Sequence, residues 1–448
     1  MRLLIENAKA ILTASSGDCV DSIQIDNGVI EAIDNAIDVP SDTQRIDARD
    51  CVVIPGLINT HHHMFQSLTR ARSHDQELFG WLSTFWRSWS SHDADWQYAS
   101  TSVASAELLL SGCTTTVDHH YLPPGSNDAD PLAAQIEAAG RLGIRLVQAM
   151  GSMNISDQNG GLAPAALCEE QEAFLARAER AIDEHHDPSP GSRLQVALAP
   201  CHPLAATEAL FRSVIDLARS RQVRLHTHVA EARNEERETL SARGMRPLEL
   251  LESWGFVGQD VWLAHCVHLS DRDIQTLAST GTAVALCPSS NLRLGSGIAR
   301  VRDLLDAGVV VSLGVDGSAS NDSGNALSEA RQLMLSSRAH GLDRGITAYE
   351  ALRIATSNGS LALGRADLGQ LEVGQRADLA IFDMNTLGSV GTDADPLAGL
   401  LLSPPPGARH VVIDGEIVVQ DYQLVHGDIS EIVDAANTII AKNRMRLG

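Results

Sequence analysis

Lysine is almost missing from this chain of 448 residues: only Lys9 and Lys442 occur, each near one end. The other basic residues are arginines, and the excess of acidic residues gives a formal net charge of -23. A chain this acidic is poorly suited to bind a nucleic-acid backbone or an anionic membrane. We therefore expect neither partner, and a strongly anionic substrate is disfavoured for the same reason.

Closely spaced cysteine pairs and long apolar runs are also missing. No Cys-x-x-Cys pair occurs, and the odd number of scattered cysteines favours a reducing compartment. No run of 18 or more apolar residues occurs, and the apolar start of the chain is interrupted at Glu6. We thus expect a cytoplasmic protein without a membrane span or signal peptide. The seven cysteines are Cys19, Cys51, Cys113, Cys168, Cys201, Cys266 and Cys287.

The middle of the chain contains eight short apolar runs separated by helical patterns. Strands that alternate with helices imply right-handed crossovers and a parallel sheet. Eight such units favour a (β/α)₈ barrel of the TIM type over an open doubly wound sheet, and no Gly-x-Gly-x-x-Gly sequence follows the first run. The predicted strands are 57–61, 114–118, 144–149, 194–199, 223–228, 261–265, 282–286 and 309–315.

Short β-rich runs broken by turns occur near both ends of the chain. The runs near the start predict an antiparallel sheet that is too small to be stable alone. We therefore expect the two ends to join in one small β-sandwich, formed by residues 1–55 and 368–448 and completed by a C-terminal helix. Residues 56–367 would then form the barrel domain.

Ionisable side chains stand at the ends of four of the eight predicted strands. Catalytic groups of such barrels lie at the carboxyl ends of the strands. Several buried titratable groups without partners would cost more free energy than a fold can spare, so a shared metal site explains the pattern better than a structural role. The residues are His61 and His63 after the first strand, His228 and the nearby Glu231 after the fifth, His265 after the sixth and Asp316 after the eighth.

The residue types indicate which metal is bound and how many ions. Imidazole and carboxylate ligands suit a borderline divalent ion, Zn²⁺ first, with Fe²⁺ also compatible. Because neither Lys9 nor Lys442 lies in the barrel, a carboxylated lysine cannot bridge two ions, and we predict one. Glu231 is placed to move protons, and its alternative role is a solvated carboxylate. His265 is placed to contact a substrate, and its alternative role is a hydrogen-bonded core histidine.

The spacing of His61, His62 and His63 separates two of these residues from the third. Alternate residues of an extended strand share one face, so His61 and His63 should point one way and His62 the other. We therefore expect His62 to be dispensable for metal binding.

These motifs together resemble the amidohydrolase superfamily, and specifically its mononuclear-zinc aminohydrolase branch. The resemblance rests on Pro-Gly-Leu-Ile-Asn-Thr-His-His-His (55–63), His-Thr-His-Val-Ala-Glu (226–231), Ala-His-Cys-Val-His-Leu (264–269) and Leu-Gly-Val-Asp-Gly (313–317). It implies that the metal ligands are His61, His63, His228 and Asp316. It also implies that Glu231 is the proton shuttle, that His265 contacts the substrate and aids formation of the hydroxide, and that Asp316 shares protons with the water.

Within that branch, residues 59–71, 78–82, 118–121 and 151–153 are most similar to 8-oxoguanine deaminases and to hydroxyatrazine hydrolases. The resemblance implies deamination of a heterocyclic amine, 8-oxoguanine to urate and ammonia, and assembly as a homo-oligomer. The chain departs from the group at Met150, where an arginine is common. Alternatives are deamination of guanine, another purine or a pterin, triazine hydrolysis, and a non-catalytic assembly protein.

The remaining candidates for the pocket come from the loops after the first two strands. Gln66 offers both a donor and an acceptor to a purine edge, and Tyr121 lies just past the second strand. Trp81, Trp86 and Trp89 cluster in what we expect to be a loop over the site. The sequence favours packing over stacking for these tryptophans, and Cys287 after strand seven is expected to be a packing residue.

Overall fold

The computed structural model describes residues 2–13, 20–90, 92–124, 131–404 and 407–443. Cys19 lies outside the described residues, and the other six cysteines are free thiols, as expected. Among the described residues, no helix combines the length and the apolar character needed to cross a membrane.

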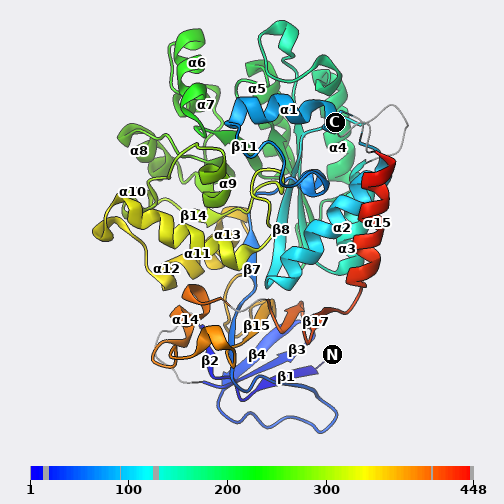
Figure 1. Cartoon of the computed structure of the whole chain (residues 1–448), viewed down its shortest axis with the longest axis vertical. Coiled ribbons are helices and arrows are strands. Elements are labelled where there is room, and N and C mark those ends of the chain that lie inside the picture. The colour runs from blue at the N-terminus through cyan, green and yellow to red at the C-terminus, as the bar shows by residue number, and fades with distance from the viewer. Residues whose placement is uncertain (1, 14–19, 91, 125–130, 405–406, 444–448) are drawn as a thin grey trace.

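Eight parallel strands form the predicted barrel, in sequence order around the sheet. The first and last strands close it, because the backbone N–H of Thr60 donates to the carbonyl of Leu313 at 2.8 Å. Figure 1 shows the strands surrounded by helices. The strands are β7 (Leu57–Asn59), β8 (Cys113–His120), β9 (Arg145–Ser152), β10 (Leu194–Pro200), β11 (Leu225–Val229), β12 (Val261–His265), β13 (Ala283–Leu286) and β14 (Val311–Leu313).

Two strands end earlier than the sequence predicts. The strand β7 ends at Asn59, so His61 and His63 follow the strand instead of belonging to it. The strand β14 ends at Leu313, before Asp316. The two extensions contact each other, since the backbone N–H of Asp316 donates to the carbonyl of His61 at 3.0 Å.

The helices of the barrel follow the predicted pattern, except in the tryptophan-rich segment. We expected a loop there, but Leu78–Trp89 forms helix α1. The carboxylate of Glu77 caps this helix by accepting from the N–H groups of Phe79 and Gly80. Helices that cover or extend the barrel are α2 (Ala94–Leu110), α3 (Pro131–Leu142), α4 (Gln171–His185), α5 (Glu208–Arg221), α6 (Arg233–Arg243), α7 (Pro247–Trp254), α8 (Asp271–Thr280), α9 (Pro288–Arg293), α10 (Val301–Asp306), α11 (Ala326–Ser337), α12 (Ala348–Ile354) and α13 (Ser357–Leu363).

Two further sheets lie below the barrel in Figure 1. The six-stranded sheet contains strands from both ends of the chain, whereas the strands of the four-stranded sheet all come from the N-terminal end. One has the order β4-β3-β1-β5 and the other β18-β17-β16-β15-β6-β2. The expected antiparallel arrangement is incomplete, because β1 pairs with β5 and β2 with β6 in parallel. The elements are β1 (Arg2–Glu6), β2 (Ala10–Ile11), β3 (Ser22–Asp26), β4 (Val29–Asp34), β5 (Gln44–Asp47), β6 (Cys51–Pro55), β15 (Leu379–Asp383), β16 (His410–Ile413), β17 (Glu416–Gln420), β18 (Gln423–Leu424), α14 (Pro396–Leu402) and α15 (Ile429–Lys442).

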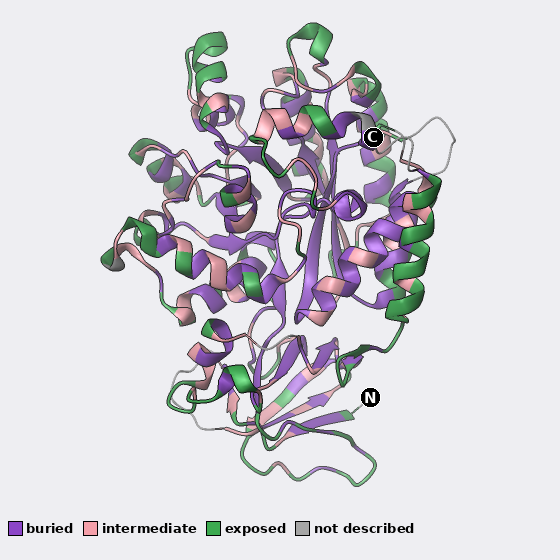
Figure 2. Ribbon diagram, in the orientation of Figure 1, coloured by how far each residue is buried: buried purple, intermediate pink, exposed green. Residues whose placement is uncertain are grey.

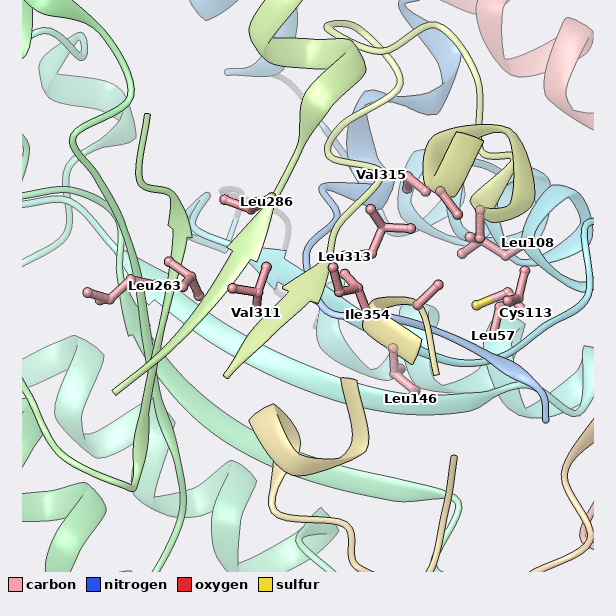
Figure 3. Packing of buried hydrophobic residues seen from close by; sticks show 14 of the residues in the cluster. Leu57, Leu108, Cys113, Leu146, Leu263, Leu286, Val311, Leu313, Val315 and Ile354 are labelled. Carbon is pink, nitrogen blue, oxygen red and sulfur yellow. The ribbon is translucent and has the colours of Figure 1, made fainter. Parts of the chain in front are cut away.

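The barrel strands are buried on both faces, which explains their unbroken apolar runs (Figure 2). Outward-facing Leu57, Leu263 and Leu286 belong to the large cluster between strands and helices shown in Figure 3. Their inward-facing neighbours Ile58 and Trp262 belong to a separate cluster inside the barrel. Because apolar side chains fill the inside of the barrel, the polar side chains lie at the carboxyl ends of the strands.

Candidate active site

Two of the predicted histidine ligands donate one ring N–H and keep the other nitrogen bare. Nδ1 of His63 lies 2.7 Å from the carbonyl oxygen of His119, and Nδ1 of His228 lies 2.6 Å from that of Cys201. A carbonyl oxygen only accepts, so each Nδ1 carries the hydrogen. In the neutral ring, Nε2 of His63 and of His228 is therefore a bare lone pair.

A chain of two hydrogen bonds through His226 likewise leaves Nε2 of the third histidine, His61, without a hydrogen. Nδ1 of His226 donates to the carbonyl of Trp262 at 2.9 Å, which makes Nε2 of His226 an acceptor. That atom accepts from Nδ1 of His61 at 2.8 Å and so leaves Nε2 of His61 bare. This nitrogen is buried and has no hydrogen-bond partner among the described residues.

Two of the bare nitrogens lie beside one carboxylate oxygen, and the third lies beside one of these two. Nε2 of His63 lies 3.0 Å from Nε2 of His228. Nε2 of His61 and Nε2 of His63 each lie 3.4 Å from Oδ1 of Asp316. Two lone pairs that face each other at this distance repel unless a cation lies between them. Three imidazole nitrogens and one carboxylate oxygen are a donor set that fits a divalent transition metal.

The charge states of these groups suit that role. Burial lowers the pKa of His61, lowers that of His63 to about 3 and holds that of His228 well below its usual value. Burial opposes ionisation of Asp316, but the neighbouring His61 and His265 hold its pKa well below the ordinary value. Neutral imidazoles and an ionised carboxylate are the forms that bind a metal.

The orientation of Asp316 is fixed by hydroxyl groups. The hydroxyls of Ser290 and Ser320 donate to Oδ2 at 2.6 and 3.0 Å. The backbone N–H of Gly317 donates to Oδ1 at 2.7 Å. With Oδ2 engaged by two hydroxyls, Oδ1 is the oxygen that faces the histidines.

Glu231 and His265 lie next to this cluster and face each other. Oε2 of Glu231 is 3.6 Å from Nε2 of His265, and both side chains are buried. Burial raises the pKa of Glu231 to about 7. Burial opposes a charge on His265, but the carboxylates of Glu231 and Asp316 hold its pKa above the usual value. A carboxyl group with a pKa near neutrality can both take up and release a proton during a reaction.

Several of these residues have a backbone conformation that ordinary residues rarely adopt. φ is +53° at Ala230, +70° at His265 and +63° at Asp316. Glu235 supports the first of these turns, because its carboxylate accepts from the N–H groups of Ala230 and Glu231, each at 2.8 Å. Backbone strain of this kind is common where side chains must be aimed at a site.

A mostly apolar pocket opens onto the cluster, and Gln66 and Tyr121 are among the residues that line it. Oε1 of Gln66 is buried without a hydrogen-bond partner in the described chain. Trp81 and Trp86 of α1 also line the pocket. Trp89 instead packs against its neighbours in α1. Further lining residues are His63, Met153, Cys201, His202, His228, Glu231, His265, Leu294, Asp316 and Ser320.

Our interpretation of the sequence missed His119, which belongs to the same cluster of buried imidazoles. Its ligand atom lies within 4.8 Å of those of His61, His63 and His228. Nε2 of His119 donates to the carbonyl of Ala199 at 2.9 Å, so its Nδ1 is bare. Strand alternation could have revealed it, because it follows inward-facing Val117 by two residues. The same alternation places His226 on one face of β11 with His228, whereas no comparable signal marked Glu235 and Asn291.

His62 and Cys287 remain close to the cluster without joining its donor set. His62 is buried, and neither of its ring nitrogens has a hydrogen-bond partner among the described residues. Cys287 is buried as expected of a packing residue, although its sulfur lies within 4.8 Å of ligand atoms of His61 and His265.

A parallel barrel with imidazoles and carboxylates gathered at the carboxyl ends of its strands defines a barrel enzyme with a metal-competent site. The chain belongs to the Amidohydrolase family, which it matches over residues 52–418. It is thus a hydrolase acting on C–N bonds.

Three similar proteins illustrate the range of the family. An 8-oxoguanine deaminase of Pseudomonas aeruginosa is 40% identical, and the match covers 98% of this chain and 99% of that protein. A hydroxydechloroatrazine ethylaminohydrolase of Pseudomonas sp. strain ADP is 36% identical, covering 89% of this chain and 84% of that protein. The solved structure of an atrazine chlorohydrolase from Arthrobacter aurescens TC1, complexed with zinc, has a TM-score of 0.91 at 32% identity, covering 98% of this chain and 100% of that chain.

Proposed function

We propose that the protein is a metal-dependent hydrolytic deaminase that converts 8-oxoguanine to urate and ammonia. The observation that carries the proposal is that bare Nε2 atoms of His61 and His63 lie beside Oδ1 of Asp316 while Nε2 of His228 lies beside that of His63, next to Glu231 and an apolar pocket. The similarity to an 8-oxoguanine deaminase over nearly the whole chain supports the choice of substrate.

His61, His63, His228 and Asp316 would hold one Zn²⁺, and the similarity to a zinc-bound structure supports zinc over Fe²⁺. When bound, the ion lowers the pKa of water and makes it nucleophilic near neutral pH. The protein contributes ligand positions that its hydrogen bonds fix in advance.

Glu231 would carry the proton that the reaction must move. Water would add its oxygen to the ring carbon that bears the amine, while Glu231 takes one proton from that water and passes it to the neighbouring ring nitrogen. Glu231 would then take the remaining proton from the new hydroxyl, which becomes the carbonyl, and pass it to the amine, so that the C–N bond breaks and ammonia leaves. His265, 3.6 Å from Glu231, is placed to contact the oxygen at the reacting carbon.

Gln66 and Tyr121 would bind the heterocycle. The bare Oε1 of Gln66 can accept from a ring N–H or an amine, and the Tyr121 hydroxyl can donate or accept. Burial holds the pKa of Tyr121 well above its usual value, so the hydroxyl stays protonated. The flat apolar walls given by Trp81 and Trp86 suit a planar ring.

Guanine, another amino-purine, a pterin or a triazine would use the same site by the same chemistry. The similarity to a hydroxydechloroatrazine ethylaminohydrolase favours a triazine as the second candidate. A non-catalytic assembly role is disfavoured, because every predicted ligand is present and oriented.

A substrate panel with zinc-loaded protein tests the proposal. We expect ammonia release and loss of the substrate's ultraviolet absorbance with 8-oxoguanine, at a higher kcat/KM than with guanine, a pterin or an aminotriazine. The metal-free protein is the control and should be inactive. A higher kcat/KM with another member of the panel would identify that heterocycle as the substrate in place of 8-oxoguanine. If no member released ammonia, the result would contradict deamination.

A further inference from the structure

Two adjacent side chains of the short helix α9 contact two different groups of the candidate active site. Oδ1 of Asn291 lies 2.9 Å from Nδ1 of His265, and the Ser290 hydroxyl donates to Oδ2 of Asp316 at 2.6 Å. All four side chains are buried. One turn of helix thus contacts both a predicted metal ligand and the histidine that faces Glu231.

The contact with Asn291 decides where His265 carries its hydrogen. An amide oxygen only accepts, so Nδ1 of His265 must be the donor. In the neutral ring the lone pair is then on Nε2. That nitrogen is the atom 3.6 Å from Oε2 of Glu231. If Asn291 donated instead, His265 would present an N–H in this direction.

The helix that carries Asn291 is itself fixed from behind by Glu329 of α11. The backbone N–H of Ser289 donates to Oε1 of Glu329 at 2.8 Å, and Nδ2 of Asn321 donates to Oε2 at 3.1 Å. Asn321 also donates to the carbonyl of Val315 at 2.5 Å, next to Asp316. Glu329 therefore couples the position of α9 to the loop that carries Asp316.

We propose that Asn291 is a positioning residue that fixes the tautomer of His265, so that in the neutral ring Nδ1 keeps its hydrogen and Nε2, the nitrogen that can take up a proton, faces Glu231 and the pocket. The inference rests on the proposed function, because His265 has a part in the reaction only if the site hydrolyses a substrate. Through its neighbour Ser290, the same helix turn keeps Oδ1 of Asp316 facing the histidines.

Two substitutions separate an acceptor from a space-filling role. Asn291→Asp keeps an acceptor of nearly the same shape, whereas Asn291→Leu keeps the volume and removes the acceptor. In the zinc-loaded wild type at alkaline pH, ¹⁵N NMR of the histidine rings should show Nδ1 of His265 protonated, with the signal assigned by its loss in His265→Gln. Asn291→Asp should keep this tautomer, and Asn291→Leu should lose it.

We expect kcat to be high in the variants that keep Nδ1 of His265 protonated and low in those that do not. We expect kcat to fall about 10- to 100-fold in Asn291→Leu with little change in KM, and to recover largely in Asn291→Asp. Leu292→Ala alters an exposed residue of the same helix and should match the wild type. Rates are measured on whichever member of the substrate panel the wild type converts.

Three results would overturn the proposal: an Nε2-protonated His265 in the wild type, wild-type kcat in Asn291→Leu, or an Asn291→Asp variant as impaired as Asn291→Leu. If Asn291→Leu does not fold, the tautomer of His265 in the wild type and in Asn291→Asp still tests the proposal. Because the NMR measurement needs no substrate, failure of the substrate panel alone would contradict the proposed function and not the tautomer.

Discussion

Within single residues, the direction of each ring nitrogen determines what a histidine can bind. His61 and His63 each engage Nδ1 in a hydrogen bond and keep Nε2 bare beside Asp316. His62 lies between them in sequence, but its nitrogens have no hydrogen-bond partner in the described residues. We therefore propose that these neighbouring histidines differ in function because their hydrogen bonds differ.

Replacing these histidines one at a time should show which of them is needed to bind zinc. We expect His61→Ala and His63→Ala to lose the zinc, because each removes one of four ligands. His62→Leu should keep about one equivalent, since a buried aliphatic side chain can fill the space of an imidazole without a bare nitrogen. Metal analysis after gel filtration measures this, and loss of zinc from His62→Leu would show that His62 supports the site.

Glu231 offers a second test at the level of the residue. Glu231→Gln keeps the shape but removes the titratable proton, so we expect kcat to fall by about 10²- to 10⁴-fold with zinc content unchanged. Steady-state kinetics combined with metal analysis measures both. Wild-type turnover in Glu231→Gln would rule out its role as proton carrier.

At the level of elements, the loops after the strands determine the geometry of the pocket. A methyl group added at Gly317, after β14, would lie 2.0 Å from Oε1 of Gln66. The φ of Gly317 is one that alanine adopts readily, so the effect of a substitution is on Gln66 and not on the backbone.

Gly317→Ala should therefore displace Gln66 and weaken substrate binding. We expect KM to rise about tenfold, as for one lost hydrogen bond, with zinc still bound. Gly140→Ala in α3 is the matched control, because an added methyl there meets open space. An unchanged KM in Gly317→Ala would argue against a role of Gln66 in binding.

The sequence predicted the elements better than the contacts between them. Apolar runs and turn signals identified the eight barrel strands, because burial on both faces imposes an unbroken apolar pattern. The proposed metal ligands could be named from the sequence because they lie at or just beyond the ends of those strands. Asn291 and Glu235 could not be named in this way, since they reach the site from the short helix α9 and from the first turn of α6. Helix α1 was missed because its aromatic residues resembled a covering loop.

For the whole molecule, one buried ion pair connects the barrel to the sheets formed by the two chain ends. Nε and Nη2 of Arg145 on β9 donate to the two carboxylate oxygens of Asp378 at 2.7 and 2.9 Å. Asp378 directly precedes β15, and both side chains are buried. Because the two side chains are joined by two parallel hydrogen bonds, we expect the loss of either partner to lower the stability of the fold.

Asp378→Asn should leave the guanidinium of Arg145 incompletely paired and lower the free energy of unfolding by about 3 kcal/mol. Asp393→Asn, at an exposed ion pair with Lys9, is the matched control and should change it by less than about 1 kcal/mol. Denaturant unfolding monitored by circular dichroism measures both. Equal stability of the two variants would show that the buried pair contributes little.

We propose that one bound metal ion enables this protein to deaminate a heterocycle. Titration of the metal-free protein with Zn²⁺, with ammonia release from 8-oxoguanine followed at each step, tests it most directly. The rate should rise linearly to one equivalent of zinc per chain and then stay constant. Ammonia release by the metal-free protein, or a rate that rises until a second equivalent is bound, would contradict a single-metal deaminase.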